Sequence, residues 1–143
     1  MDFGDAILGR ALRQSILEGD TSGAVGIIDM IRQSKDATGV IDARDSSYNT
    51  QLMQAALMGN YEIVKALAEA GANVNARGKT GFTALMFAVT YEYTDIVELL
   101  LEKKADPNAV AIIEGTKITV TARKLARDNA LLKALLKDYN AVL

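Results

Sequence analysis

A repeat with a period of 33 residues restricts the fold of this chain more than any other feature. Residues 42–74 align without a gap with residues 75–107, and 11 of the 33 aligned positions are identical. The identities are mostly apolar and fall into two clusters, which predicts two short helices in each unit. Helices this short are marginally stable alone, so each unit depends on its neighbours. We therefore expect the units to stack side by side in an array.

The residues within one unit indicate where its helices begin and end. Thr83 is a favourable N-cap, and the run behind it places Leu85 and Met86 on one side of a first helix. Gly71 is suited to a left-handed C-cap of the second helix in the preceding unit. The second helix of the later unit carries a core-facing stripe at positions i, i+1, i+4 and i+5, formed by Ile96, Val97, Leu100 and Leu101.

Two segments resemble the ankyrin repeat consensus: TQLMQAALMGNYEIVKALAEAGANVNA at 50–76 and TALMFAVTYEYTDIVELLLEKKADPNA at 83–109. The resemblance implies an all-α solenoid of four ankyrin repeats, each a helix–turn–helix unit with a β-turn or hairpin at its tip. It also implies that the outer two repeats act as caps. The approximate boundaries are 5–41, 42–74, 75–107 and 108–143, within a single domain that spans 1–143.

The chain departs from the consensus at places that carry structural expectations. Glu92 and Lys104 stand where glycine is usual, so we predict positive φ and mild backbone strain at both residues. The first unit contains an insertion at 32–38. The last unit is expected to have a shortened link between its two helices, near 128–129.

Composition excludes several classes of function. The chain has no Cys, His or Trp, which removes His/Cys zinc sites, Cys or Ser/His nucleophiles and disulfides. Sixteen basic and 18 acidic residues give no electrostatic basis for binding nucleic acid or an anionic membrane. The longest uncharged apolar stretch, 80–91, is too short to span a bilayer. Since no basic segment opens the chain, we expect no signal peptide and a cytoplasmic location, or the bacterial periplasm if a leader has been removed.

Two patterns have a catalytic or ligand-binding interpretation. Gly78-Lys79-Thr80 resembles the end of a phosphate-binding loop, but the motif needs glycine at position 73, where the chain has Asn73. Carboxylate pairs such as Asp95 and Glu98 fall on predicted helix surfaces or turns, where a solvated charge is the ordinary explanation. We therefore predict no catalytic residue, no metal ligand and no cofactor, and we interpret 78–80 as the tip of a β-turn.

The resemblance implies that a partner protein is bound by the β-turn tips and by the first helix of each unit. Tyr48 stands where glycine is usual at one tip, and Arg44 and Arg77 are expected to project from adjacent tips. Aromatic residues, Met and Arg are enriched in the cores of interfaces. The predicted partner-binding residues of the tips and first helices are Arg44, Tyr48, Leu57, Met58, Arg77, Lys79, Phe82 and Tyr91.

Four of these residues are expected to form one apolar strip on the concave side, namely Leu57, Met58, Phe82 and Tyr91. Phe82 precedes the N-cap, where a ring is difficult to bury. Leu57 and Met58 also suit packing between the helices, because methionine often fills gaps in a core. The sequence leaves both interpretations of this pair open.

The segment before the last unit is longer than the usual ankyrin turn. β-branched residues flank Gly115 on both sides over 112–120, which predicts a β-hairpin with glycine at its turn. One face is expected to cover the terminal repeat and the other to project as an apolar finger. We add its exposed residues Ile112, Ile113 and Ile118 to the predicted partner-binding set. Such a finger is either a docking element or an aggregation hazard, and docking is slightly favoured.

These observations predict a module that binds another protein, with an enzyme of the same cell as one candidate. We expect no further domain, so the economical mechanisms are inhibition or protection of the partner by obstruction, or tethering of two partners. A passive spacer with a featureless concave face is the alternative from a different class, and a carboxylate-based enzyme is less favoured. The Thr-x-Leu-Met units look bacterial, and we expect a monomer with no nucleic acid or membrane partner.

Overall fold

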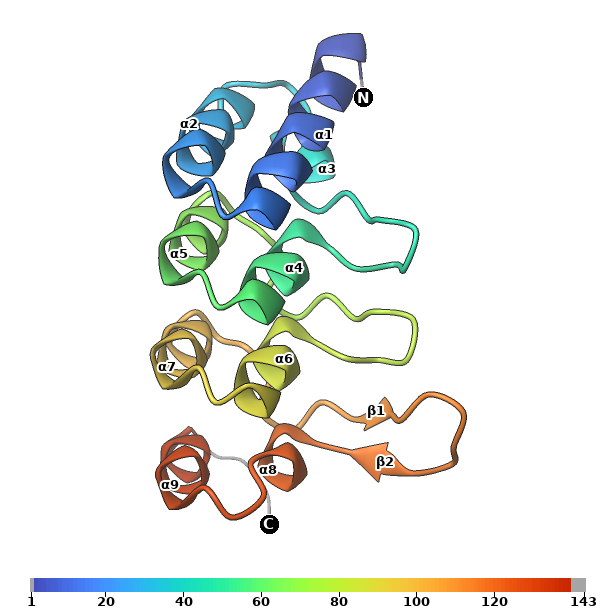
Figure 1. The fold of residues 1–143 in the computed structure, drawn as a ribbon, viewed down its shortest axis with the longest axis vertical. Helices are drawn as coiled ribbons and strands as arrows, with labels where there is room; N and C mark the ends of the chain where they lie inside the picture. The colour runs from blue at the N-terminus through green and yellow to red at the C-terminus, as the bar shows by residue number, and fades with distance from the viewer. Residues whose placement is uncertain (1, 140–143) are drawn as a thin grey trace.

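The computed structural model describes residues 2–139, and its helices stack in two parallel layers (Figure 1). One layer holds α1, α4, α6 and α8, the other α2, α5, α7 and α9, and the loops between successive pairs all project to the same side. The elements are α1 (Phe3–Glu18), α2 (Thr21–Ile31), α3 (Ala37–Ile41), α4 (Gln51–Met58), α5 (Tyr61–Glu69), α6 (Ala84–Thr90), α7 (Thr94–Glu102), β1 (Ala111–Ile112), β2 (Thr119–Val120), α8 (Ala122–Leu125) and α9 (Ala130–Asp138). The predicted all-α solenoid is confirmed.

A threonine at the equivalent position caps the first helix in each of three successive units. The hydroxyl groups of Thr50, Thr83 and Thr121 accept hydrogen bonds from the backbone N–H three residues later, at 3.3, 3.4 and 3.4 Å. Each bond satisfies one of the N–H groups that a helix N-terminus leaves unpaired. The N-cap role predicted for Thr83 is therefore confirmed, and the caps fix the point at which each projecting loop meets its helix.

A residue in the left-handed backbone conformation follows each helix of the two central units, as the period predicts. The first helices of the second and third units are followed by Gly59 at φ 75° and Glu92 at φ 59°. The second helices are followed by Gly71 at φ 92° and Lys104 at φ 71°. Positive φ at Glu92 and Lys104 is confirmed. The backbone of these two residues adopts a conformation that is free of steric cost only for glycine.

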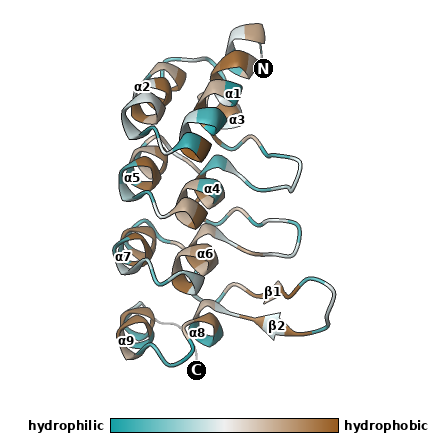
Figure 2. Cartoon of the chain, in the orientation of Figure 1, coloured by the Kyte–Doolittle hydropathy of each residue, from teal (hydrophilic) through white to brown (hydrophobic). Residues whose placement is uncertain are grey.

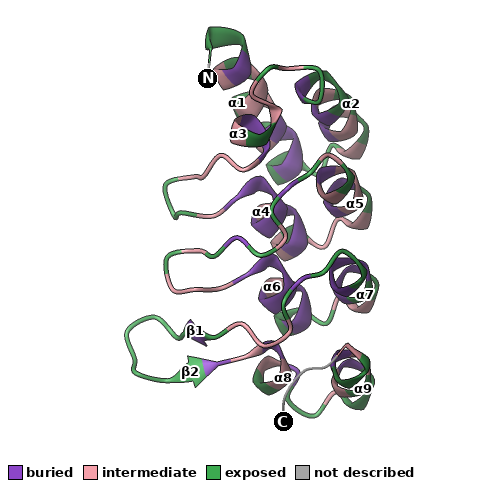
Figure 3. Cartoon of the chain, turned by 180° about the vertical axis from the view of Figure 1, so that it is seen from behind, coloured by how far each residue is buried: buried purple, intermediate pink, exposed green. Residues whose placement is uncertain are grey.

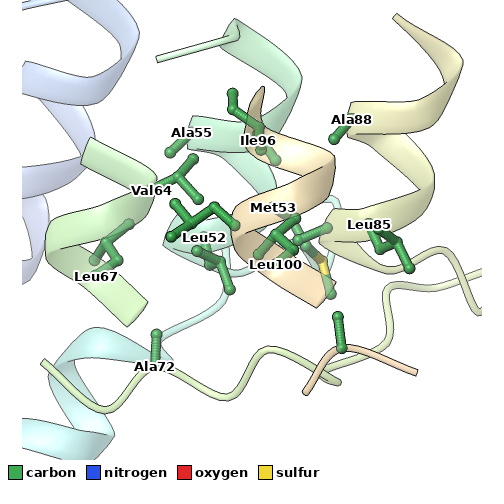
Figure 4. Close-up of a cluster of buried hydrophobic side chains, with 14 of the residues drawn as sticks. Leu52, Met53, Ala55, Val64, Leu67, Ala72, Leu85, Ala88, Ile96 and Leu100 are labelled. Carbon is green, nitrogen blue, oxygen red and sulfur yellow. The ribbon is translucent and has the colours of Figure 1, made fainter. Parts of the chain in front are cut away.

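The core runs without interruption between the two layers (Figure 4). Leu52 and Leu85 from the first helices, and Leu67 and Leu100 from the second, are all excluded from solvent. Ala55 and Ala88 are also fully buried, and their small side chains let neighbouring helices approach closely. Figures 2 and 3 show the same division, with apolar, buried surfaces facing between the layers and exposed residues at the loop tips.

The outer units differ from the sequence expectations in two ways. The insertion at 32–38 leads into a short helix, α3, which buries Val40 and Ile41 against the core. The shortened link predicted near 128–129 is wrong: four residues separate α8 from α9, compared with three between α6 and α7. The shortening lies in α8 itself, which has 4 residues where α6 has 7.

None of the helices within residues 2–139 combines the length and the apolar character that crossing a bilayer requires.

Candidate functional site

The projecting segment before the last helix pair is a β-hairpin, as predicted. β1 and β2 pair antiparallel, with Ala111 opposite Val120 and Ile112 opposite Thr119. The N–H of Ile113 donates to the carbonyl of Ile118 at 2.9 Å. Gly115 turns the chain at φ 77°.

The base and the outer end of the hairpin have different environments. Ala111 and Val120 are buried and form a small apolar cluster with Met86 of α6. Ile113 and Ile118 lie on the same face nearer the turn and are 39% and 58% exposed, and Ile112 on the opposite face is 48% exposed. The hairpin therefore packs its base on the array and exposes three branched apolar side chains, as expected, but these do not form one projecting face, because only Ile112 lies on the face opposite Ala111 and Val120.

Contacts with the preceding loop hold the hairpin in place. The N–H of Ile112 donates to the carbonyl of Thr80 at 2.8 Å, and the Arg77 guanidinium donates to the carbonyl of Val110. Lys79 Nζ lies 3.6 Å from Glu114 Oε1. Gly81 makes this approach feasible, because a Cβ there would lie 3.1 Å from the Val110 carbonyl oxygen and its φ is 87°.

The two arginines do not project freely from the tips. Arg44 Nη1 donates to the carbonyls of Tyr48 and Arg77, each at 2.8 Å, and Arg77 repeats the second bond one unit later, to Val110. The guanidinium groups therefore tie successive loops together. Each guanidinium can reach the next loop because the arginine side chain is as long as the distance between two stacked loops.

Tyr48 is held at the tip of the second unit in a left-handed conformation, at φ 64°. Its ring is exposed on the surface, and the guanidinium of Arg44 lies 4.2 Å from the ring centroid. This distance is within the range of a cation–π contact. The contact restrains a ring that is still 55% exposed.

Three residues of the predicted strip lie at the C-terminal ends of the first helices. Met58 and Tyr91 are exposed at the C-terminal ends of α4 and α6, with Leu57 half-buried beside Met58. Tyr91 stacks on Tyr93 at 6.1 Å between ring centroids, and a Cβ on Gly59 would collide with the Tyr93 ring. Glycine at 59 therefore lets this aromatic pair approach the preceding unit.

Phe82 lies at the other end of α6, so the single strip expected from the sequence is not formed. The seven residues of α6 separate it from Tyr91 by about 10 Å along the helix axis. Its ring is half-buried against the cluster beneath the hairpin and lies 5.4 Å from the ring of Phe87, centroid to centroid. The hairpin provides the cover that the sequence did not reveal.

A cavity of about 560 Å³ opens between three successive tips. It is lined by Ser46, Ser47, Asn49, Gly78, Lys79, Thr80, Phe82, Phe87, Ile113 and Glu114. Sequence reasoning missed Phe87. Its role could have been suspected only from the alignment of the units, in which the apolar Phe87 stands opposite the polar Gln54 of the preceding unit.

Backbone groups and the Asp45 carboxylate form the hydrogen bonds that hold the tip loops. The N–H of Gly78 donates to the carbonyl of Phe82 at 2.8 Å, and the N–H of Gly81 to the carbonyl of Gly78 at 3.0 Å. Asp45 accepts from the N–H groups of Ser47 and Asn49. Residues 78–80 are thus the tip of a turn, as predicted. Among residues 2–139, no group of three or more acidic side chains is placed to hold a metal ion.

Comparison with known protein families identifies the family to which the repeats belong. The family model described as Ankyrin repeats (3 copies) matches residues 22–111, more than half of the chain. No curated protein sequence matches the chain significantly. Ankyrin repeats are generally modules for protein–protein interaction and typically have no enzymatic activity. The matched region runs from α2 to the start of the hairpin and includes the helix pairs α4/α5 and α6/α7 with their projecting loops, and the chain belongs to the ankyrin repeat family.

Proposed function

We propose that this chain binds a partner protein through its tip surface, defined as Tyr48, Lys79, Ile112, Ile113 and Ile118. The observation that carries the proposal is the projecting hairpin, which exposes three isoleucines near its outer end while its base, at Ala111 and Val120, is packed on the array. Contiguous apolar groups on the surface of a folded protein generally mark an interaction site. The loops that present these groups are fixed by Arg44 and Arg77, which act as positioning residues.

A second contact region lies at the helix ends, where Leu57, Met58 and Tyr91 form what we call the helix-end patch. Tyr91 is restrained by its stacking on Tyr93, so less side-chain entropy is lost when a partner covers it. An interface of ordinary size, about 800 Å² on each partner, is wide enough to include both regions.

Binding would act by occupying the partner's surface. If the partner is an enzyme, a projecting apolar hairpin can enter or cover its active-site cleft, which inhibits the enzyme or protects the cell from it. This extension has a direct test, the activity of the captured enzyme at saturating concentrations of this chain. Full activity under saturation would contradict inhibition while leaving binding intact.

The test of binding uses a triple variant, Ile112→Ser, Ile113→Ser and Ile118→Ser, as bait for proteins of the source cells. We expect the affinity for the partner retained by the unchanged chain to fall at least tenfold, about 1.4 kcal/mol, because buried apolar anchors dominate interfaces. Melting should change little, since the three side chains are exposed.

A control variant removes apolar side chains that are at least as exposed from other parts of the surface. Met30 on α2 and Leu131 on α9 are 58% and 64% exposed, and Met30→Ser with Leu131→Ser should leave the affinity unchanged. An equal loss of affinity in both variants would indicate nonspecific hydrophobic binding. Retention of no protein by the unchanged chain would favour a passive spacer. Either outcome would overturn the proposal.

A further inference from the structure

We propose that the cavity between the tips, which nothing above assigns, receives one uncharged aromatic side chain of a partner protein. The inference rests on the proposed function for the source of that side chain. The chemistry of the cavity itself can be tested without any partner.

The floor of the cavity favours an aromatic group. Phe82 and Phe87 lie 5.4 Å apart between centroids with their planes tilted by 42°, and Ile113 of the hairpin adds an apolar wall. A third ring entering here would meet both edges and faces, the arrangement that aromatic groups prefer. Both phenylalanines are only half-buried in the free chain, so part of each ring has no apolar neighbour.

The rim offers hydrogen bonds that the protein does not use. The side chains of Ser46, Ser47, Asn49 and Thr80 line the cavity and make no hydrogen bond among the described residues. Hydroxyl and carboxamide groups can both donate and accept. They can therefore pair with the backbone or the polar atom of an incoming aromatic residue.

The charge of the lining favours a neutral occupant. Lys79 and Glu114, the two charged lining residues, form an ion pair with each other. The lining therefore has no net charge, and a charged ligand would gain no net electrostatic attraction here.

The volume, about 560 Å³, falls within the range of about 300 to 1,000 Å³ typical of ligand sites. It accommodates an aromatic side chain together with the adjoining backbone. The absence of a side chain on Gly78 preserves this space, since a Cβ there would lie 3.1 Å from Asn49 Oδ1.

N-acetyl-tryptophanamide is a suitable probe, because it is neutral and the chain contains no Trp. Its fluorescence can be followed selectively during titration, and amide NMR shifts locate the site. We expect saturable shifts at Ser47, Thr80, Phe87 and Ile113, with a dissociation constant of about 1 mM for so small a ligand. Binding should change by less than about twofold with added salt, because no net charge is involved. N-acetyl-tryptophan, which carries a carboxylate, should bind several-fold more weakly.

Phe87→Gln is the decisive variant, because it installs the residue that the preceding unit holds at the equivalent position. We expect at least a tenfold loss of probe affinity, while Gln54→Ala, the matched control, should retain full affinity. Ser47→Glu, at an exposed rim position, should also weaken binding and cannot act by unfolding the core. Unaltered binding by Phe87→Gln and Ser47→Glu, or no saturable shift at the lining residues, would overturn the inference.

The two proposals fail separately in these experiments. If the isoleucine variants lose the partner but the probe does not bind, the cavity inference alone is wrong. If the probe binds as described but no partner is retained, the cavity chemistry stands and the proposed function is wrong.

Discussion

At the scale of single residues, the four side chains at positive φ, among residues 2–139, are the clearest departures from a regular repeat. They are Tyr48, Glu92, Lys104 and Arg127. Glu92 has a visible role, because its carboxylate accepts a hydrogen bond from Asn129 Nδ2 at 2.9 Å and ties the third unit to the fourth. Tyr48 presents its ring at a tip. Lys104 is exposed and bonded through its backbone, whose carbonyl accepts from Asn75 Nδ2 and whose N–H donates to the carbonyl of Leu101.

Lys104→Gly should therefore stabilise the chain. A left-handed conformation costs a residue with a side chain about 1–2 kcal/mol, of which the greater freedom of glycine in the unfolded chain cancels a part. We expect the free energy of unfolding, measured with urea, to rise by about 0.5–1 kcal/mol. Lys103→Gly is the matched control: its φ is −83°, so glycine there should destabilise. A fall of equal size in both variants would contradict the account.

Sequence reasoning succeeded for residues whose role depends on local chemistry and failed where a neighbouring unit decides. The cap at Thr83 and positive φ at Lys104 follow from position within one repeat. The placement of Arg44 and Phe82 does not, because the distance to the next loop and the cover provided by the hairpin belong to the stacked array.

At the scale of elements, the hairpin was predictable, and so were the two helices of the last unit, but α3 and the shortness of α8 were not. Alternating β-branched residues around Gly115 predict paired strands whatever the surroundings. α3 has 5 residues and α8 has 4, so neither shows a helical period in the sequence. Tertiary packing stabilises them: Val40 and Ile41 of α3 and Ala122 of α8 are buried in the core.

Arg77→Ala should loosen the hairpin without unfolding the array. The Arg77 guanidinium holds the Val110 carbonyl next to the point where Ile112 donates to Thr80. Hydrogen bonds to charged groups contribute about 1.5–3 kcal/mol, so we expect amide exchange at Ile112 and Ile113 to accelerate at least tenfold.

Arg44→Ala provides the control for that measurement. It removes the equivalent bond one unit earlier, so the hairpin amides should keep their exchange rates while those near Tyr48 exchange faster. Unchanged exchange of the hairpin in Arg77→Ala would contradict the role assigned to the Arg77 guanidinium.

At the scale of the whole molecule, the 33-residue period determines the architecture because every unit buries its apolar face against the next. The core consequently continues through all four helix pairs of the described region, and the loops project on one side (Figure 1). The division into four repeats at the stated boundaries, and the capping role of the outer two, stay predictions. The cavity could not be foreseen, because it is assembled from three units.

Hydrogen–deuterium exchange of the chain, free and bound to its retained partner, tests the central claim that the projecting tips form the binding surface. The account predicts slower exchange at 46–49, 79–82 and 111–119, with the outward faces of α2, α5, α7 and α9 unchanged. Slower exchange confined to those outer helices, with the tips exchanging as in the free chain, would contradict it.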